Sequence, residues 1–346
     1  MKNKSLKKGR TMSTGPPFGD FHGSRAAAIQ HALTDSLVDD TIAIVCQYAK
    51  QLRVLMLGGV CHNNTLQHTI VTYNPSTGQW ETVAAARWDE VRMFAAGAVV
   101  ANTLYVSTGF AGGRGRARWH RSLNLQTWTW TPFLRRAANN AYPHVVLVTP
   151  TMTHLFVLGG NTEIFDAVDR RTSLHCYDVA DDRWSEKCHT NHRHKQPGGA
   201  VCGSQIYAIG GINQKAVERY DMATDQWSAC SPLLSYRYAC AVAVVDHQFI
   251  FACGGIAEDG NGLSSCEAYS VALDRWYTVA NMLKARRFAS AVYIDGQVMV
   301  CGGTASLSFS DHDTCISAET YNCPTNVWTL TSPMPCPRQR AIAVVI

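Results

Sequence analysis

Long apolar runs are missing from this chain of 346 residues. No stretch reaches the roughly 18 consecutive apolar residues that a membrane-spanning helix needs, so no helical span is expected. Charged residues are also few, at 16%, and the formal net charge is only +5. A charge excess of this size does not indicate wholesale binding to nucleic acid. The basic start of the chain is followed by no apolar stretch, so a secretory signal is not expected either.

Motifs that would indicate an enzyme or a metal centre are absent as well. No Cys-x-x-Cys pair occurs, which argues against a zinc site of the usual spacing. The glycine-rich segment 112–115 lacks the Lys-Ser/Thr that completes a phosphate-binding loop. There is no Gly-x-Ser-x-Gly elbow, and no pair of carboxylates that a repeat would bring together. We therefore expect no catalytic residues, no cofactor and no metal, and a protein that is not an enzyme.

Cysteine, by contrast, is abundant, with 13 residues scattered along the chain. Several of them, such as Cys202, Cys253 and Cys301, stand inside apolar segments, where cysteine acts as a small hydrophobe. Since no secretory signal is expected, we interpret them as reduced thiols. The expected location is cytoplasmic, with a nuclear location as an alternative.

One stretch recurs along the sequence, and its cleanest copy runs from Gln205 to Ser228. An apolar segment, 206–209, is followed by Gly210-Gly211, then by Tyr220 and by Trp227. Short apolar segments of this kind are typical of strands that are buried on both faces. Tandem glycine favours a tight turn or a close approach of two backbones.

Six copies of this pattern can be aligned, with their second glycines 44 to 51 residues apart. Copy two is the least regular, because Leu123 or Leu125 replaces the tyrosine and either Trp128 or Trp130 can be its tryptophan. The period predicts a β-propeller with one four-stranded blade per repeat, in which Tyr and Trp fill the space between blades. The structural repeat residues are Gly58, Gly59, Gly109, Gly159, Gly160, Gly210, Gly211, Gly254, Gly255, Gly302, Gly303, Trp80, Trp128, Trp184, Trp227, Trp276 and Trp328.

This pattern resembles the kelch repeat, and the resemblance covers about residues 53–346. It implies an all-β fold, a six-bladed kelch-type β-propeller over residues 52–346. The apolar segment 341–346 has no blade of its own, so we expect it to pair beside 53–57 and close the ring, which removes two open sheet edges. Residues 1–23 are predicted to be a disordered basic tail and 24–51 a short helical extension. The extension faintly resembles the BACK domain of BTB–BACK–kelch proteins, but a complete BTB domain is not present.

A candidate binding face comes from one position in each repeat, 16 or 17 residues before the first residue of the glycine pair. This residue opens the innermost strand, so we expect it to point into the mouth of the central channel. In kelch-type adaptors, which this chain resembles, this position and the loops after the glycine pair bind the partner. The predicted partner-binding residues are Arg92, Tyr142, His194, Arg237, Arg286 and Arg338, joined by Arg114, Arg116 and Trp119 of one loop.

Two interpretations of these residues remain open. A ring of guanidinium groups would favour carboxylates through paired hydrogen bonds. Alternatively, each arginine only caps its strand and pairs with an Asp or Glu of a neighbouring blade. A histidine-rich loop with His189, His192 and His194 lies close to Cys188, but its spacing matches no defined metal motif, so we expect an incidental role.

The resulting expectation is a monomeric protein-interaction module that binds an acidic peptide or loop at the channel mouth, with no nucleic acid and no membrane as partner. The resemblance implies substrate recognition for ubiquitin ligation, or actin or scaffold binding. The rival expectation is a carbohydrate-active enzyme, since some kelch-type propellers are oxidases or epimerases. An enzyme would need a carboxylate or histidine with a shifted pKa deep in the funnel, whereas a binding module would need a broad basic rim.

Overall fold

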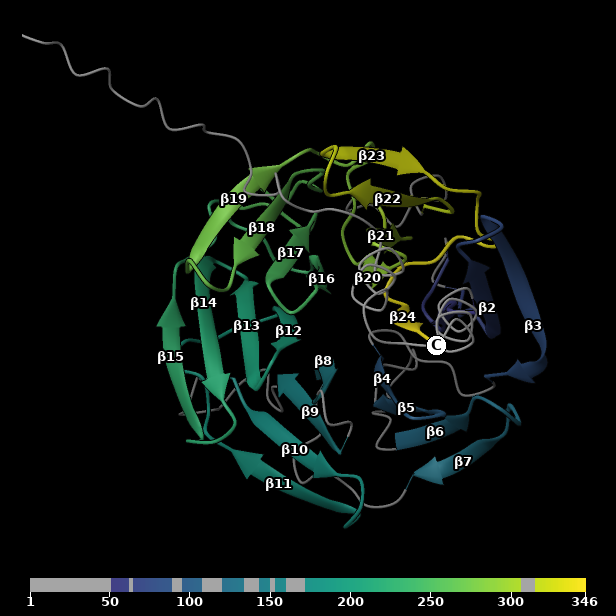
Figure 1. Cartoon of the computed structure of the whole chain (residues 1–346), viewed down its shortest axis with the longest axis horizontal. Helices are drawn as coiled ribbons and strands as arrows, with labels where there is room; N and C mark the ends of the chain where they lie inside the picture. The colour runs from purple at the N-terminus through teal and green to yellow at the C-terminus, as the bar shows by residue number, and fades with distance from the viewer. Residues whose placement is uncertain are drawn as a thin grey trace, which may run out of the picture.

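The structure is a computed structural model that describes residues 51–61, 65–88, 95–107, 120–133, 143–149, 153–159, 172–305 and 315–346. Within these ranges the chain forms six four-stranded antiparallel sheets, arranged as blades around a common axis (Figure 1). The six-bladed all-β propeller predicted from the repeats is therefore confirmed. The predicted tail and helical extension, 1–23 and 24–51, lie outside the described residues apart from 51.

The strands follow the same order in every blade, from the innermost strand to the outermost. Blade 1 contains β24 (Ile342–Val345), β1 (Val54–Leu57), β2 (Thr69–Asn74) and β3 (Gln79–Arg87). Blade 2 contains β4 (Ala96–Val100), β5 (Thr103–Ser107), β6 (His120–Asn124) and β7 (Trp130–Phe133). Blade 3 contains β8 (Pro143–Val148), β9 (His154–Gly159), β10 (Leu174–Asp178) and β11 (Arg183–Lys187).

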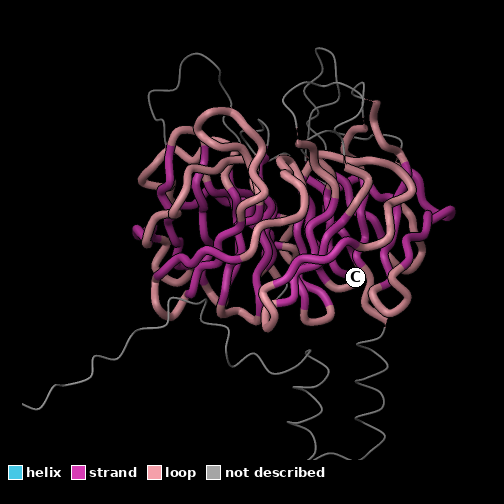
Figure 2. The backbone as a smooth tube through the Cα atoms, turned by 90° about the horizontal axis from the view of Figure 1, so that it is seen from above, coloured by secondary structure: helices cyan, strands magenta, loops and turns pink. Residues whose placement is uncertain are grey.

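The remaining three blades come from the part of the chain with the most regular repeats. Blade 4 contains β12 (Gly198–Cys202), β13 (Gln205–Gly211), β14 (Gln214–Asp221) and β15 (Gln226–Cys230). Blade 5 contains β16 (Ala241–Val245), β17 (Phe249–Cys253), β18 (Cys266–Ser270) and β19 (Arg275–Val279). Blade 6 contains β20 (Ser290–Ile294), β21 (Gln297–Cys301), β22 (Ala318–Asn322) and β23 (Val327–Leu330). Figure 2 shows these strands crossing between two rims of loops.

Blade 1 joins the two ends of the propeller. β24 pairs antiparallel with β1, with Val345 opposite Val54 and Ile342 opposite Leu57. Backbone hydrogen bonds between Arg53 and Ile346 extend the pairing by one residue. The pairing expected between 341–346 and 53–57 is thus confirmed, and it leaves the ring without a gap between its first and last sheets (Figure 1). No helix in the described part of the chain is long and apolar enough to cross a membrane.

The hydrophobic core lies between neighbouring blades. One cluster, for example, packs Ala243 and Phe251 of blade 5 against Tyr321 and Trp328 of blade 6. The apolar segments that the sequence marks as buried on both faces are fully enclosed, as in the all-buried strand β17. Each blade therefore contributes apolar side chains to two interfaces, which explains why its strands lack simple alternation.

In four of the repeats the tryptophan joins adjacent blades through its polar edge, as expected. In blade 5 the Tyr269 hydroxyl donates to the Asp274 carboxylate, which also accepts from the Ser231 amide of the preceding loop. The Trp276 indole N–H donates to the Ser231 carbonyl over 2.9 Å. Equivalent indole bonds are made by Trp80, Trp227 and Trp328.

Blade 2 corrects one residue of the predicted repeat. Trp130, not Trp128, is the repeat tryptophan, because it faces Leu123 across the β6–β7 pair just as Trp227 faces Tyr220 in blade 4. Trp128 instead occupies the turn position that Asp225 takes in blade 4, and both have positive φ, 57° and 54°. Asp and Asn tolerate this left-handed conformation better than Trp does. The equivalent turn position in the other blades is Gly, Asp or Asn, so blade 2 is the exception.

The glycine pair is required where two backbones meet. A Cβ on Gly254 would lie 2.2 Å from the Arg286 carbonyl oxygen of the next loop, and a Cβ on Gly302 would lie 2.2 Å from that of Arg338. Both glycines also have positive φ. The close approach expected from the sequence is therefore confirmed in these blades. Gly109 and Gly160 of the predicted set lie outside the described residues.

Candidate functional site

Three of the four arginines predicted to line the channel mouth lie among the described residues, and all three are buried inside their blades. Arg237, Arg286 and Arg338 are at most 1% exposed. Arg237 donates to the Gly254 and Ser265 carbonyls of its own blade and forms an ion pair with Glu267, with Nη2 and Oε1 2.7 Å apart. The partner-binding role of these side chains is therefore corrected. They secure the loop that enters each blade, as in the alternative that the sequence left open, although Glu267 belongs to the same blade and not to a neighbouring one.

Glutamate completes this arrangement by holding the same loop from the other side. In blade 6, Glu319 accepts hydrogen bonds from Nε and Nη2 of Arg286 and from the backbone amides of Leu283 and Lys284. Glu267 accepts in the same way from the amides of Leu234 and Ser235. We call this arrangement of one arginine or histidine, one glutamate and two loop amides the loop clamp. In blade 6 both Nε and Nη2 of the arginine reach the glutamate, as a buried ion pair requires, whereas in blade 5 Nε of Arg237 has no hydrogen-bond partner among the described residues.

Blade 4 builds the clamp with histidine. His194, 2% exposed, faces the Gly210 carbonyl through Nδ1 at 2.7 Å and the Glu218 carboxylate through Nε2 at 2.9 Å. Burial acts to raise the pKa of Glu218, but hydrogen bonds from His194 and from the His192 amide outweigh it and lower the pKa to about 2. His194 is therefore also corrected from a partner-binding to a structural residue.

Blade 1 has the arginine of the clamp without its glutamate. Arg338 donates to the Gly58 carbonyl over 3.1 Å and to the Thr69 hydroxyl over 2.6 Å, and Nη2 lies 3.3 Å from the Cys336 sulfur. Among the described residues no carboxylate forms an ion pair with it, and its Nε has no hydrogen-bond partner. Burial lowers the pKa of Arg338, and the neighbouring Cys336 acts against that shift.

The residues that do line the channel stand two positions after the clamp residues. Gln196, Ala239, Phe288 and Arg340 have positive φ, between 53° and 56°. Three backbone hydrogen bonds link them: the Ala239 amide donates to the Gln196 carbonyl, the Phe288 amide to the Ala239 carbonyl, and the Arg340 amide to the Phe288 carbonyl. We call these four residues the collar. A left-handed backbone at a non-glycine residue is strained, and here it recurs at the equivalent position of four successive repeats. Such strain often marks functional sites.

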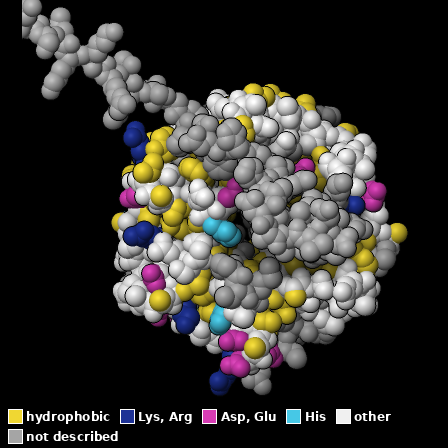
Figure 3. Space-filling view, viewed as in Figure 1, with side chains coloured by type: hydrophobic (Ala, Val, Ile, Leu, Met, Phe, Trp, Pro, Cys, Tyr) yellow, Lys and Arg dark blue, Asp and Glu magenta, His cyan; other side chains and the backbone are white. Residues whose placement is uncertain are grey.

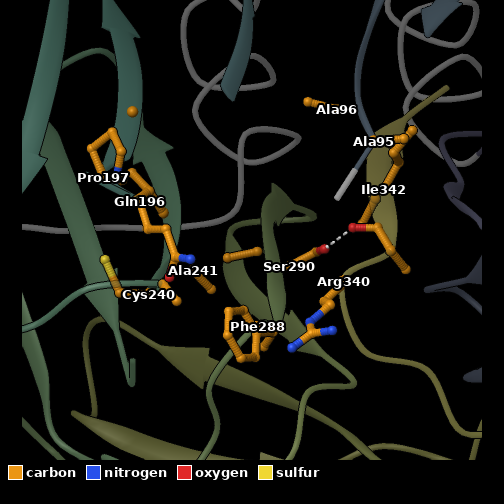
Figure 4. Close-up of a pocket in the computed structure, with 18 of the residues that line it drawn as sticks. Ala95, Ala96, Gln196, Pro197, Cys240, Ala241, Phe288, Ser290, Arg340 and Ile342 are labelled. Atoms are coloured by element: carbon orange, nitrogen blue, oxygen red, sulfur yellow. Dashed lines mark hydrogen bonds between the residues drawn. The ribbon is translucent and has the colours of Figure 1, made fainter. Parts of the chain in front are cut away.

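The collar encloses a cavity of about 220 Å³ at the axis of the ring. Figure 4 shows Phe288 and Arg340 next to each other, with Gln196 and Pro197 across the opening from Ile342. The rest of the lining is mainly Ala and Gly from the beginnings of the inner strands. A small, largely apolar cavity with one cationic group suits the end of a side chain or of a peptide rather than a large ligand.

Positive charge is concentrated beside Phe288. The Arg340 guanidinium carbon lies 4.5 Å from the centroid of the Phe288 ring, and that of the buried Arg287 lies 5.9 Å from it. Burial, followed by repulsion from Arg287, lowers the pKa of Arg340 to about 10. An anion placed in the cavity would relieve this repulsion. On the face seen in Figure 3, by contrast, the described Lys and Arg side chains are scattered near the outer edge.

Three exposed apolar side chains lie on loops next to the clamps. Leu234 and Leu283 are 48% and 58% exposed, and both belong to loops held by a clamp. Ile316 is 43% exposed, and its carbonyl accepts a hydrogen bond from Met334 of the loop that enters blade 1. Exposed leucine and isoleucine on rigid loops are typical of a protein-contact surface.

The remaining predicted residues divide into two groups. His189 pairs with Glu186 and His192 with Glu218, and no group of three metal-ligating side chains occurs among the described residues. Five residues predicted to bind a partner lie outside the described residues, and their role stays a prediction: Arg92, Arg114, Arg116, Trp119 and Tyr142. The collar residues are not among those predicted to bind a partner. The signal for them is that the residue type at their position differs from copy to copy, whereas the clamp position is mostly arginine.

Comparison with known proteins agrees with the fold. The kelch motif matches residues 193–234, 236–283 and 285–335. Kelch-like protein 25 of Xenopus tropicalis is 27% identical over 217 residues, which cover 59% of this chain and 35% of that protein. Kelch-like protein 35 of Mus musculus is 26% identical over 59% of this chain and 34% of its own length. Kelch-like protein 26 of Danio rerio is 32% identical, over 26% of this chain and 16% of its own. The chain thus spans about a third of the length of the first two relatives.

Proposed function

We propose that this propeller, which matches the kelch motif within residues 193–335, is a protein-interaction module and that its collar recognises an acidic, extended segment of a partner protein. The main support for this proposal is the pair of arginines, Arg287 and Arg340, beside Phe288. Arg340 borders an apolar cavity, and Arg287 lies close enough to repel it electrostatically. A carboxylate entering the cavity would pair with the guanidinium in surroundings of low dielectric constant, where such a contact is strong.

The loops around the collar support an extended partner rather than a small molecule. Leu234, Leu283 and Ile316 provide apolar contacts away from the axis, and a peptide crossing the collar would reach several of them. Apolar contacts would then supply binding energy, and the carboxylate would fix the register of the peptide. The clamps keep these loops rigid before binding, which limits the entropy lost on association.

A role as a substrate adaptor in a ubiquitin ligase complex extends this proposal. Its support is the similarity to kelch-like proteins, of which this chain matches about a third of the length. We place this activity in the cytoplasm, where the many thiols of the chain would stay reduced. Co-purification of a cullin together with the chain would support the adaptor role. Capture of actin filaments instead would favour a scaffold.

An enzyme acting on carbohydrate at the same opening is the second candidate, and the composition of the cavity weighs against it. The described lining residues include no Asp, Glu or His. Glycoside and epimerase chemistry generally needs such a group to move a proton. The cavity lining therefore favours binding over catalysis.

Charge reversal at the collar tests the proposal. Fluorescence anisotropy would compare an acidic, glutamate-rich peptide with its lysine counterpart, using wild type, Arg340→Glu and Arg275→Glu. Arg275 is exposed on the outer strand β19, so its reversal changes the net charge equally without touching the collar. We expect Arg340→Glu to weaken acidic-peptide binding at least about tenfold and Arg275→Glu to leave it nearly unchanged. Equal losses in both variants would contradict a collar site.

A further inference from the structure

Blade 1 contains a buried cation whose hydrogen-bond partners among the described residues are all neutral groups. Arg338 is fully buried and contacts a carbonyl, a hydroxyl and a thiol. The equivalent residues Arg237 and Arg286 each contact a buried glutamate. A buried guanidinium that lacks an anion is costly, because nothing compensates its lost hydration.

Two sequence changes account for the missing carboxylate. Val71 stands opposite Met56 in the register position where Glu319 stands opposite Val300 in blade 6. Pro335 replaces Leu283, so the loop also lacks one of the two amides that would bind the carboxylate. Because glutamate and its amide partner are both absent, the clamp of blade 1 is built for a different anion.

Cys336 occupies the place where that anion is needed. Its sulfur lies 3.3 Å from Nη2 of Arg338 and 3.8 Å from the Thr69 hydroxyl. Cys336 is partly exposed, whereas eight of the other described cysteines, Cys253 and Cys301 among them, are buried. A thiolate is stabilised by an adjacent guanidinium, and the thiolate is the reactive form of cysteine.

We propose that Arg338 and Thr69 activate the Cys336 sulfur as a nucleophile, and that Cys336 is a site of modification by peroxides. The only other titratable side chain that acts electrostatically on Arg338 among the described residues is the buried thiol of Cys61. Thr69 faces the sulfur from β2 and can donate its hydroxyl hydrogen to it. Arg338 and Thr69 together give the sulfur two hydrogen-bond donors, which stabilises negative charge on it.

The reaction with a peroxide balances without a further reagent. The thiolate sulfur attacks one peroxide oxygen, an S–O bond forms and the O–O bond breaks. Hydroxide leaves and takes a proton from solvent, so hydrogen peroxide yields water. Sulfur is oxidised by two electrons to the sulfenic acid, and the peroxide is reduced by the same two electrons. Reduction by a thiol would restore the original state.

Alkylation of the intact protein measures the thiolate directly. Wild type would be treated with iodoacetamide at pH 6.5, and each cysteine quantified by peptide mass spectrometry. Cys188 is the internal reference, because it is the more exposed thiol of the two. Solvent access alone would make Cys188 the faster of the two. We expect Cys336 to react at least about tenfold faster than Cys188, because the adjacent guanidinium stabilises its thiolate.

Supplying a carboxylate to Arg338 provides the second test. Val71→Glu should slow alkylation of Cys336 toward the rate of Cys188, because the new carboxylate takes over the guanidinium. Val71→Gln, matched in size, and Cys61→Ser should leave Cys336 fast. Should Val71→Glu fail to fold, the wild-type pH profile decides: alkylation of Cys336 should reach its plateau at a lower pH than alkylation of Cys188.

Peroxide modification is then measured by trapping the sulfenic acid with dimedone. Treatment of the wild type with hydrogen peroxide should label Cys336 before Cys188, and Val71→Glu should reverse this order. Equal alkylation rates and superimposable pH profiles at the two cysteines would overturn the proposal. So would a fast thiol that dimedone never labels. None of these measurements involves a partner protein, so they are independent of binding at the collar.

Discussion

The loops that enter blade 6 and blade 1 have the same geometry but different chemistry. Arg286 and Arg338 both reach a glycine carbonyl and a hydroxyl of their own blade, Gly302 with Ser317 in one and Gly58 with Thr69 in the other. Only blade 6 adds a glutamate. The neutral contacts are therefore sufficient to place the guanidinium, and the counter-ion is a separate feature that a blade can lose or exchange.

The free energy of unfolding should therefore respond differently to the loss of each arginine. Removing an arginine from blade 6 leaves a buried carboxylate, whereas removing one from blade 1 leaves only neutral acceptors. The two arginines have nearly equal exposure, 0% in each case, so solvent access does not confound their comparison. The expected effects on stability decrease from the ion pair of blade 6, through Arg338 of blade 1 and Glu218 of blade 4, to the irregular turn of blade 2.

The largest effect is expected for Arg286→Met. Glu319 would remain buried without its cation, and breaking a buried ion pair in this way costs about 3–5 kcal/mol. Urea unfolding would measure the loss in the free energy of unfolding. The double variant Arg286→Met/Glu319→Leu is the control, because it removes both charges and should recover much of the stability. A double variant no more stable than the single one would show that the charge imbalance is not the cause.

A smaller loss is expected for Arg338→Met in blade 1. No carboxylate is left unpaired there, so the cost is that of unsatisfied neutral acceptors, about 1–3 kcal/mol. The same urea titration applies, and the difference between the two arginine variants is the quantity of interest. If Arg338→Met were as destabilising as Arg286→Met, the glutamate would have no separate role in the clamp.

Acid should weaken the clamp of blade 4. The pKa of Glu218 in the folded state is about 2, below its ordinary value of 4.5. A depressed carboxyl pKa contributes stability above pH 4.5, and this contribution is lost as the pH falls toward 2. Thermal unfolding between pH 6 and pH 2.5 should show a loss on the order of 1–2 kcal/mol that is absent from Glu218→Gln. Parallel curves for the two proteins would contradict this assignment.

The smallest effect is expected at the irregular turn of blade 2. Trp128 has the left-handed backbone that Asp182, Asp225 and Asp274 adopt in other blades. Trp128→Asn should relieve about 0.5–1 kcal/mol of backbone strain, partly offset by lost apolar contacts. The net shift of the melting temperature should therefore be within a few degrees. Trp130→Asn, which removes the true repeat tryptophan, should destabilise much more and serves as the control.

The fold was largely predictable because it depends on spacing. Glycine pairs and aromatic residues at a regular period require six blades, and the unpaired final segment requires β24 to lie beside β1. Blade 2 was ambiguous for a physical reason. Trp128 and Trp130 are two residues apart, so alternation along a strand cannot distinguish them, and no tyrosine marks the partner strand.

The binding residues were less predictable, because spacing does not give the direction of a side chain. Each clamp arginine comes just before the innermost strand of its blade in the sequence. Its side chain nevertheless points into the blade toward carbonyl groups, as the hydrogen bonds of Arg237, Arg286 and Arg338 show. A residue type that recurs at one position of every repeat more often stabilises the common fold than contacts one particular partner. The collar, with Gln196, Ala239, Phe288 and Arg340, varies from blade to blade, as a surface specific for one partner would.

The hydrogen bonds between collar residues involve peptide groups alone. A mutation at Gln196, Phe288 or Arg340 that keeps the left-handed backbone therefore leaves the joints between blades intact. Evolution, or a protein engineer, can exchange the chemistry at the axis one blade at a time without rebuilding the ring. Asparagine and glycine, which adopt this conformation most readily, would be the first substitutions to try when retargeting the propeller.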